Sequence, residues 1–148
     1  MSGRSGPFWD SVEGRAPLPE AAATLGLEFI DADVEAGTIE LAFTATEAFT
    51  NPTGNVLGAF QAAMLYDTVG PALLATLEPD QFQSTLQFNV SFLRPVRPGR
   101  LFGRGRVVNR DGDLAFLEAT LVDAQGLVIA TASATARVIA LSRARTAA

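Results

Sequence analysis

The chain has 148 residues, of which 48% are apolar and 18% charged, so it is long enough for one domain and too apolar for a disordered chain. It contains no cysteine and no histidine, which excludes disulfides, a cysteine nucleophile, a Ser-His-Asp triad and histidine-ligated zinc. Catalytic proton transfer would therefore depend on carboxylates, hydroxyls or bound water. A net charge of −5 argues against a nucleic-acid partner.

The first 18 residues are predicted to be an N-terminal extension of the folded domain. Residues 1–7 are polar and rich in glycine and lack the apolar run of a secretory signal, so a cytoplasmic protein is expected. A short helix is predicted over residues 19–25. Strands over residues 27–34 and 38–44 follow it and are joined by a hairpin.

The longest stretch of low charge spans residues 57–77 and predicts a helix. Its 21 residues contain one carboxylic acid, Asp67, beside the phenol of Tyr66. The length alone would permit a membrane span, but Asp67, Gln61 and Pro71 interrupt the stretch and no arginine stands near either end. A buried helix of a soluble domain is therefore the preferred interpretation.

Strands are predicted over the remainder of the domain, because apolar and polar residues alternate with a period of two. The first strand after the helix spans residues 83–93 and presents a different set of side chains on each face. One set is Leu86, Phe88, Val90 and Phe92, and the other is Thr85, Gln87, Asn89 and Ser91. Further strands over residues 100–109, 114–123 and 127–138 are predicted to form a meander.

Small residues on two of these strands predict where the helix packs. One face of the predicted strand over residues 100–109 carries Gly103 and Gly105, and one face of the strand over residues 127–138 carries alternating alanines. The expected fold is α+β, with an antiparallel sheet of about six strands wrapped around one long central helix over residues 19–140 and a flexible tail over residues 141–148. A helix that is apolar on every side needs more cover than one sheet provides, so a homodimer is expected.

Asp67 is the first candidate for chemistry, because a carboxylate in so apolar a stretch loses hydration and needs donors or a chemical role. A purely structural role, satisfied by nearby hydroxyls or amides, remains an alternative. The second candidate is the loop over residues 51–59, which places small residues at the start of the helix. Amide groups at a helix N-terminus stabilise a developing oxyanion, although an ordinary turn has the same composition.

Arginine supplies all eleven basic residues and is concentrated in one region. Six arginines fall between positions 94 and 110, where no acid occurs: Arg94, Arg97, Arg100, Arg104, Arg106 and Arg110. Such a cationic stripe suits phosphate groups, which arginine binds in bidentate fashion. A solvated sheet face, or a dimer seam that pairs with Asp111 and Asp113, would have the same pattern.

Three segments carry a family resemblance. They are Phe49-Thr50-Asn51-Pro52-Thr53-Gly54-Asn55-Val56-Leu57-Gly58-Ala59, the helix that bears Asp67, and Val90-Ser91-Phe92-Leu93-Arg94-Pro95-Val96-Arg97-Pro98-Gly99. Together they resemble the hotdog-fold acyl-CoA thioesterases, in particular the phenylacetyl-CoA thioesterase (PaaI)-like branch, with weaker similarity over residues 25–138.

The resemblance implies a catalytic set of Asp67, Gly58, Thr85 and Asn51. In the family, the loop reads Asn-x-x-Gly-x-x-His-Gly-Gly, the amide that falls on Gly58 forms the oxyanion hole, and an acid on the following helix acts as nucleophile or base. This chain departs from the pattern in two ways. Leu57 and Ala59 replace the histidine and the second glycine, and an ungapped count places the family's acid on Tyr66, one residue before Asp67.

The implied reaction is hydrolysis of an acyl-CoA thioester to the free acid and CoA. Gly58 N–H polarises the carbonyl, and Asp67 attacks it or deprotonates a water that Thr85 helps to position. No metal and no cofactor are implied, because CoA enters as part of the substrate. The expected substrate-binding residues are Leu57, Ala59, Phe60, Met64, Tyr66, Phe88, Asn89, Arg94, Arg97 and Arg110, with the three arginines holding the nucleotide part of CoA.

The expected partners are the small-molecule acyl-CoA and further copies of the chain, as a dimer or a dimer of dimers, with neither nucleic acid nor membrane. The alternative is a hotdog protein that binds acyl-CoA or lipid without turnover. In that protein Tyr66 would replace the catalytic acid and Asp67 would be structural.

Overall fold

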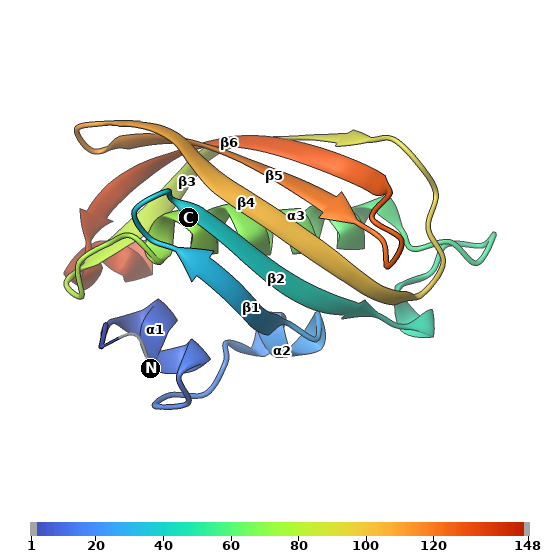
Figure 1. The fold of residues 1–148 in the computed structure, drawn as a ribbon, viewed down its shortest axis with the longest axis horizontal. Coiled ribbons are helices and arrows are strands. Elements are labelled where there is room, and N and C mark those ends of the chain that lie inside the picture. Colours follow the sequence, from blue (N-terminus) through green and yellow to red (C-terminus); the bar gives the residue numbers. More distant parts are fainter. Residues whose placement is uncertain (1–2, 147–148) are drawn as a thin grey trace.

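A six-stranded antiparallel sheet wraps around one long helix in the computed structural model, which describes residues 3–146 (Figure 1). The helical elements are α1 (Pro7–Val12), α2 (Glu20–Thr24), the 3-10 helix η1 (Glu47–Phe49), α3 (Gly58–Leu74) and the 3-10 helix η2 (Leu141–Thr146). The strands are β1 (Glu28–Asp33), β2 (Thr38–Ala45), β3 (Gln81–Phe92), β4 (Gly99–Asp111), β5 (Leu114–Val122) and β6 (Val128–Ala140). The predicted α+β class and central helix are confirmed.

The strands are ordered β1-β2-β4-β5-β6-β3 across the sheet. The meander of β4, β5 and β6 is as predicted, and β3 pairs with β6 rather than with its sequence neighbour β4. This crossover leaves β1 and β3 as the two edge strands. The main-chain groups on the outer side of β3 therefore lack a strand to pair with in this chain.

Helix α3 packs closely on the sheet because the sheet presents small residues to it. A β-carbon built at Gly103 would overlap the hydroxyl of Thr68, and one at Gly105 would lie 3.0 Å from the Thr68 carbonyl oxygen. On β6 the four alternating alanines are buried: Ala130, Ala132, Ala134 and Ala136. These contacts confirm the prediction that the glycine and alanine faces seat the helix.

A β-bulge between Thr85 and Gln87 interrupts the predicted alternation of β3. Leu86 occupies the bulge and is 50% exposed, so it does not join Phe88 on the inner face. Thr85 shares the inner face with buried Gln83, whose side chain its hydroxyl contacts, while Gln87 points outward. The expectation that Thr85 shares a face with Gln87 and Asn89 is therefore wrong, because one inserted residue reverses the order of the faces.

The predicted N-terminal extension contains a helix, α1, that sequence periodicity did not indicate. Trp9 is buried and its indole Nε1 donates a hydrogen bond to the Ala75 carbonyl at 3.1 Å. Its ring also packs edge-on against Phe8 and Phe29. These contacts place α1 against the end of α3.

The residues predicted as a flexible tail include η2, where Leu141 N donates to the Asp80 carbonyl at 2.7 Å. Residues 147–148 of that prediction lie outside the described residues. Within residues 3–146, no helix is both long enough and apolar enough to cross a membrane.

Candidate active site

The loop before α3 is ordered by the side chain of Asn51. Its Oδ1 accepts hydrogen bonds from Thr53 N at 3.0 Å, from Thr53 Oγ1 at 2.7 Å and from Asn55 N at 3.0 Å. The tight turn that results passes through Gly54 at φ +83°, a conformation that favours glycine. Asn51 thus shapes the loop, and its carboxamide oxygen is occupied by the turn.

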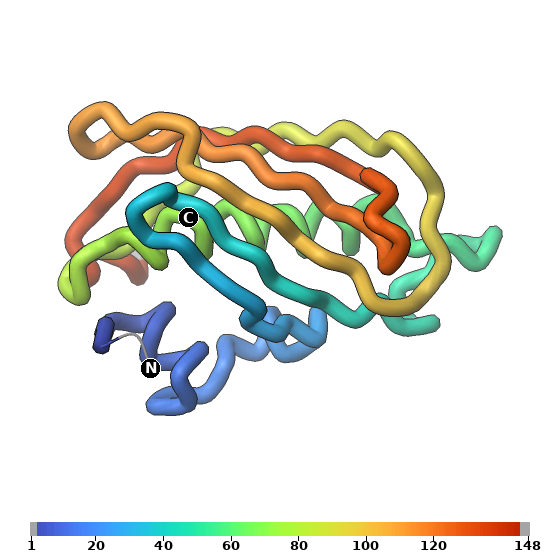
Figure 2. Tube along the Cα trace, in the orientation of Figure 1, coloured from blue at the N-terminus to red at the C-terminus, as the bar shows by residue number. Residues whose placement is uncertain are grey.

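Three further contacts hold this loop at the start of α3. Val56 N donates to the Val96 carbonyl at 2.8 Å, and Arg97 Nη1 donates to the Thr53 carbonyl at 2.9 Å. Figure 2 shows the loop and the β3–β4 connection side by side at one end of the sheet. Gln61, which was not among the predicted site residues, is buried and donates from Nε2 to the Val56 carbonyl at 3.1 Å.

The first amides of α3 are available to a ligand. The Leu57 carbonyl accepts the first helical hydrogen bonds, from Phe60 N at 2.9 Å and Gln61 N at 3.2 Å. Gly58 N–H and Ala59 N–H have no acceptor among residues 3–146. Because the helix dipole makes this end positive, the two amides suit a developing oxyanion. The ring of Phe92 lies beside Gly58, and a β-carbon there would approach it to 3.2 Å.

Asp67 lies in an apolar groove in the middle of α3. Burial raises the pKa of its carboxyl from 3.8 to about 6. No described side chain or amide donates a hydrogen bond to this carboxylate, and Tyr66 is the only other titratable group among the described residues that line the groove. The carboxylate is thus neither paired nor fully hydrated, which is typical of a functional acid or base.

The groove consists of two adjoining cavities, and both Tyr66 and Asp67 line both of them. The outer cavity measures about 490 Å³ and lies between α2, α3 and Phe88 of β3. The inner cavity measures about 280 Å³ and lies beneath α1. Tyr66 is 39% exposed and meets Phe88 edge-on with ring centroids 5.2 Å apart, whereas Asp67 is the more buried of the two.

Not all of the predicted site residues come together in one chain. Gly58 and Asp67 are nine residues apart on α3, which separates them by roughly 13 Å along the helix axis. Met64 is fully buried in the core, and Phe60 stacks on Phe49 with ring centroids 4.1 Å apart. Of the predicted acyl-binding residues, Phe88 and Tyr66 are the two that line the groove with Asp67.

The three arginines predicted to bind CoA occupy two ends of the sheet. Arg94 Nη1 donates to the Val128 carbonyl at 2.9 Å, near Arg97 and the loop before α3. Arg110 Nε donates to the Gly112 carbonyl at 3.1 Å, in the hairpin at the opposite end of β4. All three are exposed, but one chain does not bring them together.

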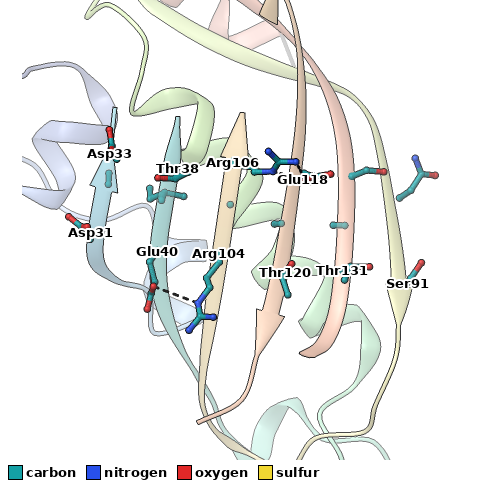
Figure 3. Close-up of a pocket in the computed structure, with 17 residues that line it drawn as sticks. Asp31, Asp33, Thr38, Glu40, Ser91, Arg104, Arg106, Glu118, Thr120 and Thr131 are labelled. Carbon is teal, nitrogen blue, oxygen red and sulfur yellow. Dashed lines mark hydrogen bonds and ion pairs between the residues drawn. The ribbon is translucent and has the colours of Figure 1, made fainter. Parts of the chain in front are cut away.

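The remaining arginines of the stripe form ion pairs on the outer face of the sheet. Arg104 pairs with Glu40 at 3.6 Å, as Figure 3 shows, and Arg106 pairs with Glu118. These pairs line a shallow groove of about 690 Å³, to which Asn89 also contributes. Because neighbouring strands supply the acids, the charge of these arginines is balanced, which favours the alternative of a solvated sheet face over a phosphate site. Asn89 therefore lies on the sheet face opposite to Asp67.

Comparison with known proteins identifies the family. The thioesterase superfamily profile matches residues 53–130. A Ralstonia eutropha structure described as a phenylacetic acid degradation-related protein is 41% identical, with 88% of this chain and 98% of that chain covered and a TM-score of 0.85. A Haemophilus influenzae thioesterase is 20% identical, with 93% and 94% covered and a TM-score of 0.79. No curated protein sequence matches significantly.

The PaaI protein of the E. coli phenylacetic acid degradation operon is 17% identical, with 89% of this chain and 93% of that chain covered and a TM-score of 0.78. The chain belongs to the thioesterase superfamily, since the profile match covers more than half of it. The two more distant structures show a shared fold, the hotdog fold. Membership supports an enzyme that hydrolyses thioesters, and the resemblance to the PaaI-like branch is confirmed.

Proposed function

We propose that the protein hydrolyses an acyl-CoA thioester, with Asp67 as the base that activates water. The observation that supports this role is the unpaired carboxylate of Asp67, buried in an apolar groove with a pKa of about 6. A pKa in this range leaves most of the carboxylate ionised at neutral pH and makes it a stronger base than an ordinary aspartate. The acyl carbon of a thioester is electrophilic, so one carboxylate and one or two amide donors are sufficient without histidine.

In the proposed reaction, Asp67 accepts a proton from water while the water oxygen bonds to the acyl carbon. The negative charge that develops on the carbonyl oxygen is stabilised by the amide of Gly58. When the intermediate collapses, the carbon–sulfur bond breaks and the proton held by Asp67 passes to the sulfur of CoA. The products are the free acid and CoA.

One chain cannot supply both groups, because roughly 13 Å of helix separate Gly58 from Asp67. A thioester carbonyl requires the base and the amide within about 3 to 4 Å of its reacting atoms. A second copy of the chain must therefore provide one of them.

The edge strand β3 is the surface that we propose for this second copy. It is twelve residues long and its outer edge has no strand partner in this chain. Phe92 and the following Leu93 are exposed at 54% and 56%, and an exposed apolar edge strand is a template for pairing. Two copies joined edge to edge by a two-fold axis would form one continuous sheet.

Such a dimer would bring the two halves of the site together. Helix α3 runs antiparallel to β3, because Gly58 lies beside Phe92 at one end and Gly70 lies against Gln83 at the other. A two-fold axis near the middle of β3 would place Phe92 and Gly58 of the second copy opposite Gln83. The amide of one copy would then face Asp67 of the other, one turn of helix from Gly70.

The same axis gives the predicted CoA-binding arginines a common location. Arg94 and Arg97 lie at the Phe92 end of the sheet, and Arg110 lies at the end where β3 begins. A two-fold axis through β3 places these two ends beside each other in different copies. We propose that they bind the phosphate groups of CoA from both subunits.

Release of free CoA from a series of acyl-CoAs tests the activity, and matched variants test the groups. Gly58→Pro removes the amide donor, and proline suits this position because it is the first residue of the helix and Leu57 before it is extended. Gly58→Ala adds a side chain and keeps the amide, so it is the control. We expect Gly58→Pro and Asp67→Asn to lose at least 100-fold in kcat, and Gly58→Ala and Tyr66→Phe to retain most of it.

Mixed dimers test whether the site is shared. If Gly58→Pro and Asp67→Asn subunits are co-expressed, half of the dimers contain one of each, and each mixed dimer has one intact site. About a quarter of the wild-type activity should return in the mixture, by the closed two-fold symmetry of the proposed dimer. A mixture as inactive as its components would show that one chain holds the whole site. Acyl-CoA binding without any release of CoA would instead support the non-catalytic alternative.

A further inference from the structure

The inner cavity of the groove extends from Asp67 beneath the N-terminal segment. Its walls are mostly apolar and come from α1, the segment after it, α3 and the start of β3. The apolar lining residues are Pro7, Phe8, Val12, Leu18, Pro19, Ala22, Leu27, Pro71, Leu74 and Phe82. At about 280 Å³ it lies at the lower limit of small-ligand sites, which are about 300 to 1,000 Å³. Such a cavity suits a short acyl group.

Besides Tyr66 and Asp67, two polar side chains line this cavity, Ser11 and Gln83. The hydroxyl of Ser11 already donates to the Pro17 carbonyl at 3.2 Å. Gln83 is only 7% exposed, and its Oε1 accepts a hydrogen bond from Thr85 Oγ1 at 3.3 Å. This bond orients the carboxamide so that Nε2 lies against Gly70, which also lines the cavity. The bulge in β3 is what places Thr85 and Gln83 on the same inner face.

The Nε2 group of Gln83 has no acceptor among residues 3–146, although the side chain is almost completely buried. In the same part of the chain, Gln61 Oε1 is the one fully enclosed side-chain polar atom that lacks a partner. Gln83 Nε2 therefore still reaches open space, which the cavity that it lines provides. A donor that faces a mostly apolar cavity without an acceptor is poorly solvated, so this one is expected to serve a ligand.

We propose that the inner cavity binds the far end of the acyl group and that Gln83 selects acyl groups that carry a hydrogen-bond acceptor there. This inference rests on the proposed function, because it treats Asp67 as the position of the thioester carbonyl. It names the specificity-determining residue and the class of substrate, a short acyl group with a carbonyl or ether oxygen near its end. Gln83 touches the substrate away from the reacting atoms, so it acts on selection.

The distance between Asp67 and Gly70 predicts which carbon of the acyl group carries the hydrogen-bond acceptor. Asp67 and Gly70 are three residues apart on one face of α3, which is a rise of about 4.5 Å along the helix axis. In an extended carbon chain each bond of about 1.5 Å advances roughly 1.25 Å, so about four bonds span this distance. The acceptor is therefore expected on the fifth carbon of the acyl group, counted from the thioester carbonyl.

Two acyl-CoAs of equal length test the selection: 5-oxohexanoyl-CoA carries the acceptor at this carbon, and hexanoyl-CoA lacks it. We expect the wild-type kcat/KM to favour 5-oxohexanoyl-CoA at least tenfold, because a site built to hydrogen-bond a group discriminates strongly against its absence. In Gln83→Met, which has similar length and no donor, the preference should fall to within about twofold of unity while hexanoyl-CoA is still hydrolysed. Gln87→Met is the matched control, since Gln87 is exposed on the outer face of the same strand and should leave the preference unchanged.

A second variant tests the same donor without removing a buried side chain. A β-carbon at Gly70 would meet only Gln83 Nε2, at 3.2 Å, within the described structure. Gly70→Ala should therefore displace the amide and reduce the preference, while alanine favours the helix itself. A preference that survives both Gln83→Met and Gly70→Ala would overturn the assignment.

Binding to Asp67→Asn separates this inference from the proposed function. Calorimetry with the two intact acyl-CoAs should show the same preference in Kd as in wild-type kcat/KM. Equal Kd values, or hydrolysis of both compounds at equal rates by the wild type, would overturn the role of Gln83 and leave thioester hydrolysis intact. Selective binding without hydrolysis of either compound by the wild type would support the pocket and refute the proposed reaction.

Discussion

Replacing Asp67 by asparagine is expected to stabilise the protein at neutral pH while it removes the proposed base. Burial raises the pKa of Asp67 from 3.8 to about 6, so between these pH values the native state holds a proton that the unfolded chain has released. Stability therefore falls as the pH rises through this range, and the full cost of the buried charge is present above about pH 6. Asparagine has nearly the same shape and carries no charge, so the variant does not bear this cost.

The magnitude follows from the rise in pKa. At 1.36 kcal/mol per pH unit, the rise from 3.8 to about 6 corresponds to about 3 kcal/mol at most. The side chain is half-buried, so solvent screening reduces the expected gain of Asp67→Asn to about 1 to 3 kcal/mol at pH 8. At pH 4 the carboxyl is protonated in the native state, and the two proteins should be almost equally stable.

Equilibrium unfolding in guanidinium chloride at pH 4 and pH 8 measures this difference, at one fixed protein concentration. The fluorescence of Trp9, the sole tryptophan, and far-UV circular dichroism follow the transition. Asp80→Asn is the control, because Asp80 is exposed and should change stability by less than about 0.5 kcal/mol at either pH. An Asp67→Asn variant that is less stable than the wild type at pH 8 would show that donors satisfy the carboxylate, and the reasoning would be wrong.

The structure predicts the results of three further experiments: a pH profile of the activity, a substitution at Gly103 and a substitution at Arg97. The kcat/KM for thioester hydrolysis should fall about tenfold per pH unit below about pH 6, as Asp67 becomes protonated, and a profile flat to pH 4.5 would exclude it as the base. Gly103→Ala should destabilise the fold by about 1 to 3 kcal/mol through overlap with Thr68, and Thr68→Ala in the same chain should recover part of this loss in a denaturant titration. Arg97→Ala should raise KM about fivefold for an acyl-CoA and not for the corresponding N-acetylcysteamine thioester, whereas Arg100→Ala on the outer sheet face should change neither. Equal changes in KM for both thioesters would show that Arg97 orders the loop before α3 and does not bind CoA.

The strands and the central helix are predictable because their signals are local and repeated. The alternation in β4, β5 and β6 and the long apolar stretch of α3 specify their own secondary structure, and the small residues of β4 and β6 indicate the packing. Helix α1 is not predictable in this way, because six residues contain less than two turns of periodicity. Its position depends on Trp9, whose contacts with Ala75 and Phe29 join segments far apart in the sequence.

The same distinction between local signals and tertiary contacts applies to the candidate site. A single carboxylate in an apolar stretch is visible in the sequence, so Asp67 is predictable from the sequence alone. Gln83 is not found, because its orientation depends on a bulge in β3 and on a cavity that α1 closes. A strict alternation assigns Thr85 to the wrong face for the same reason, since an inserted residue changes the faces without changing the composition.

The one-residue offset between Tyr66 and Asp67 changes the direction in which the side chain leaves α3. A single step on a helix rotates a side chain by about 100°, which would normally carry it to another surface. Both residues nevertheless line the same two cavities, because α2, Phe88 and α1 together surround a wide arc of α3. A carboxylate one residue later therefore still enters the groove, and from a more buried position than Tyr66. The departure from the spacing that the resemblance implies thus leaves an acid in the groove, at a deeper and less hydrated position where burial raises the pKa of Asp67.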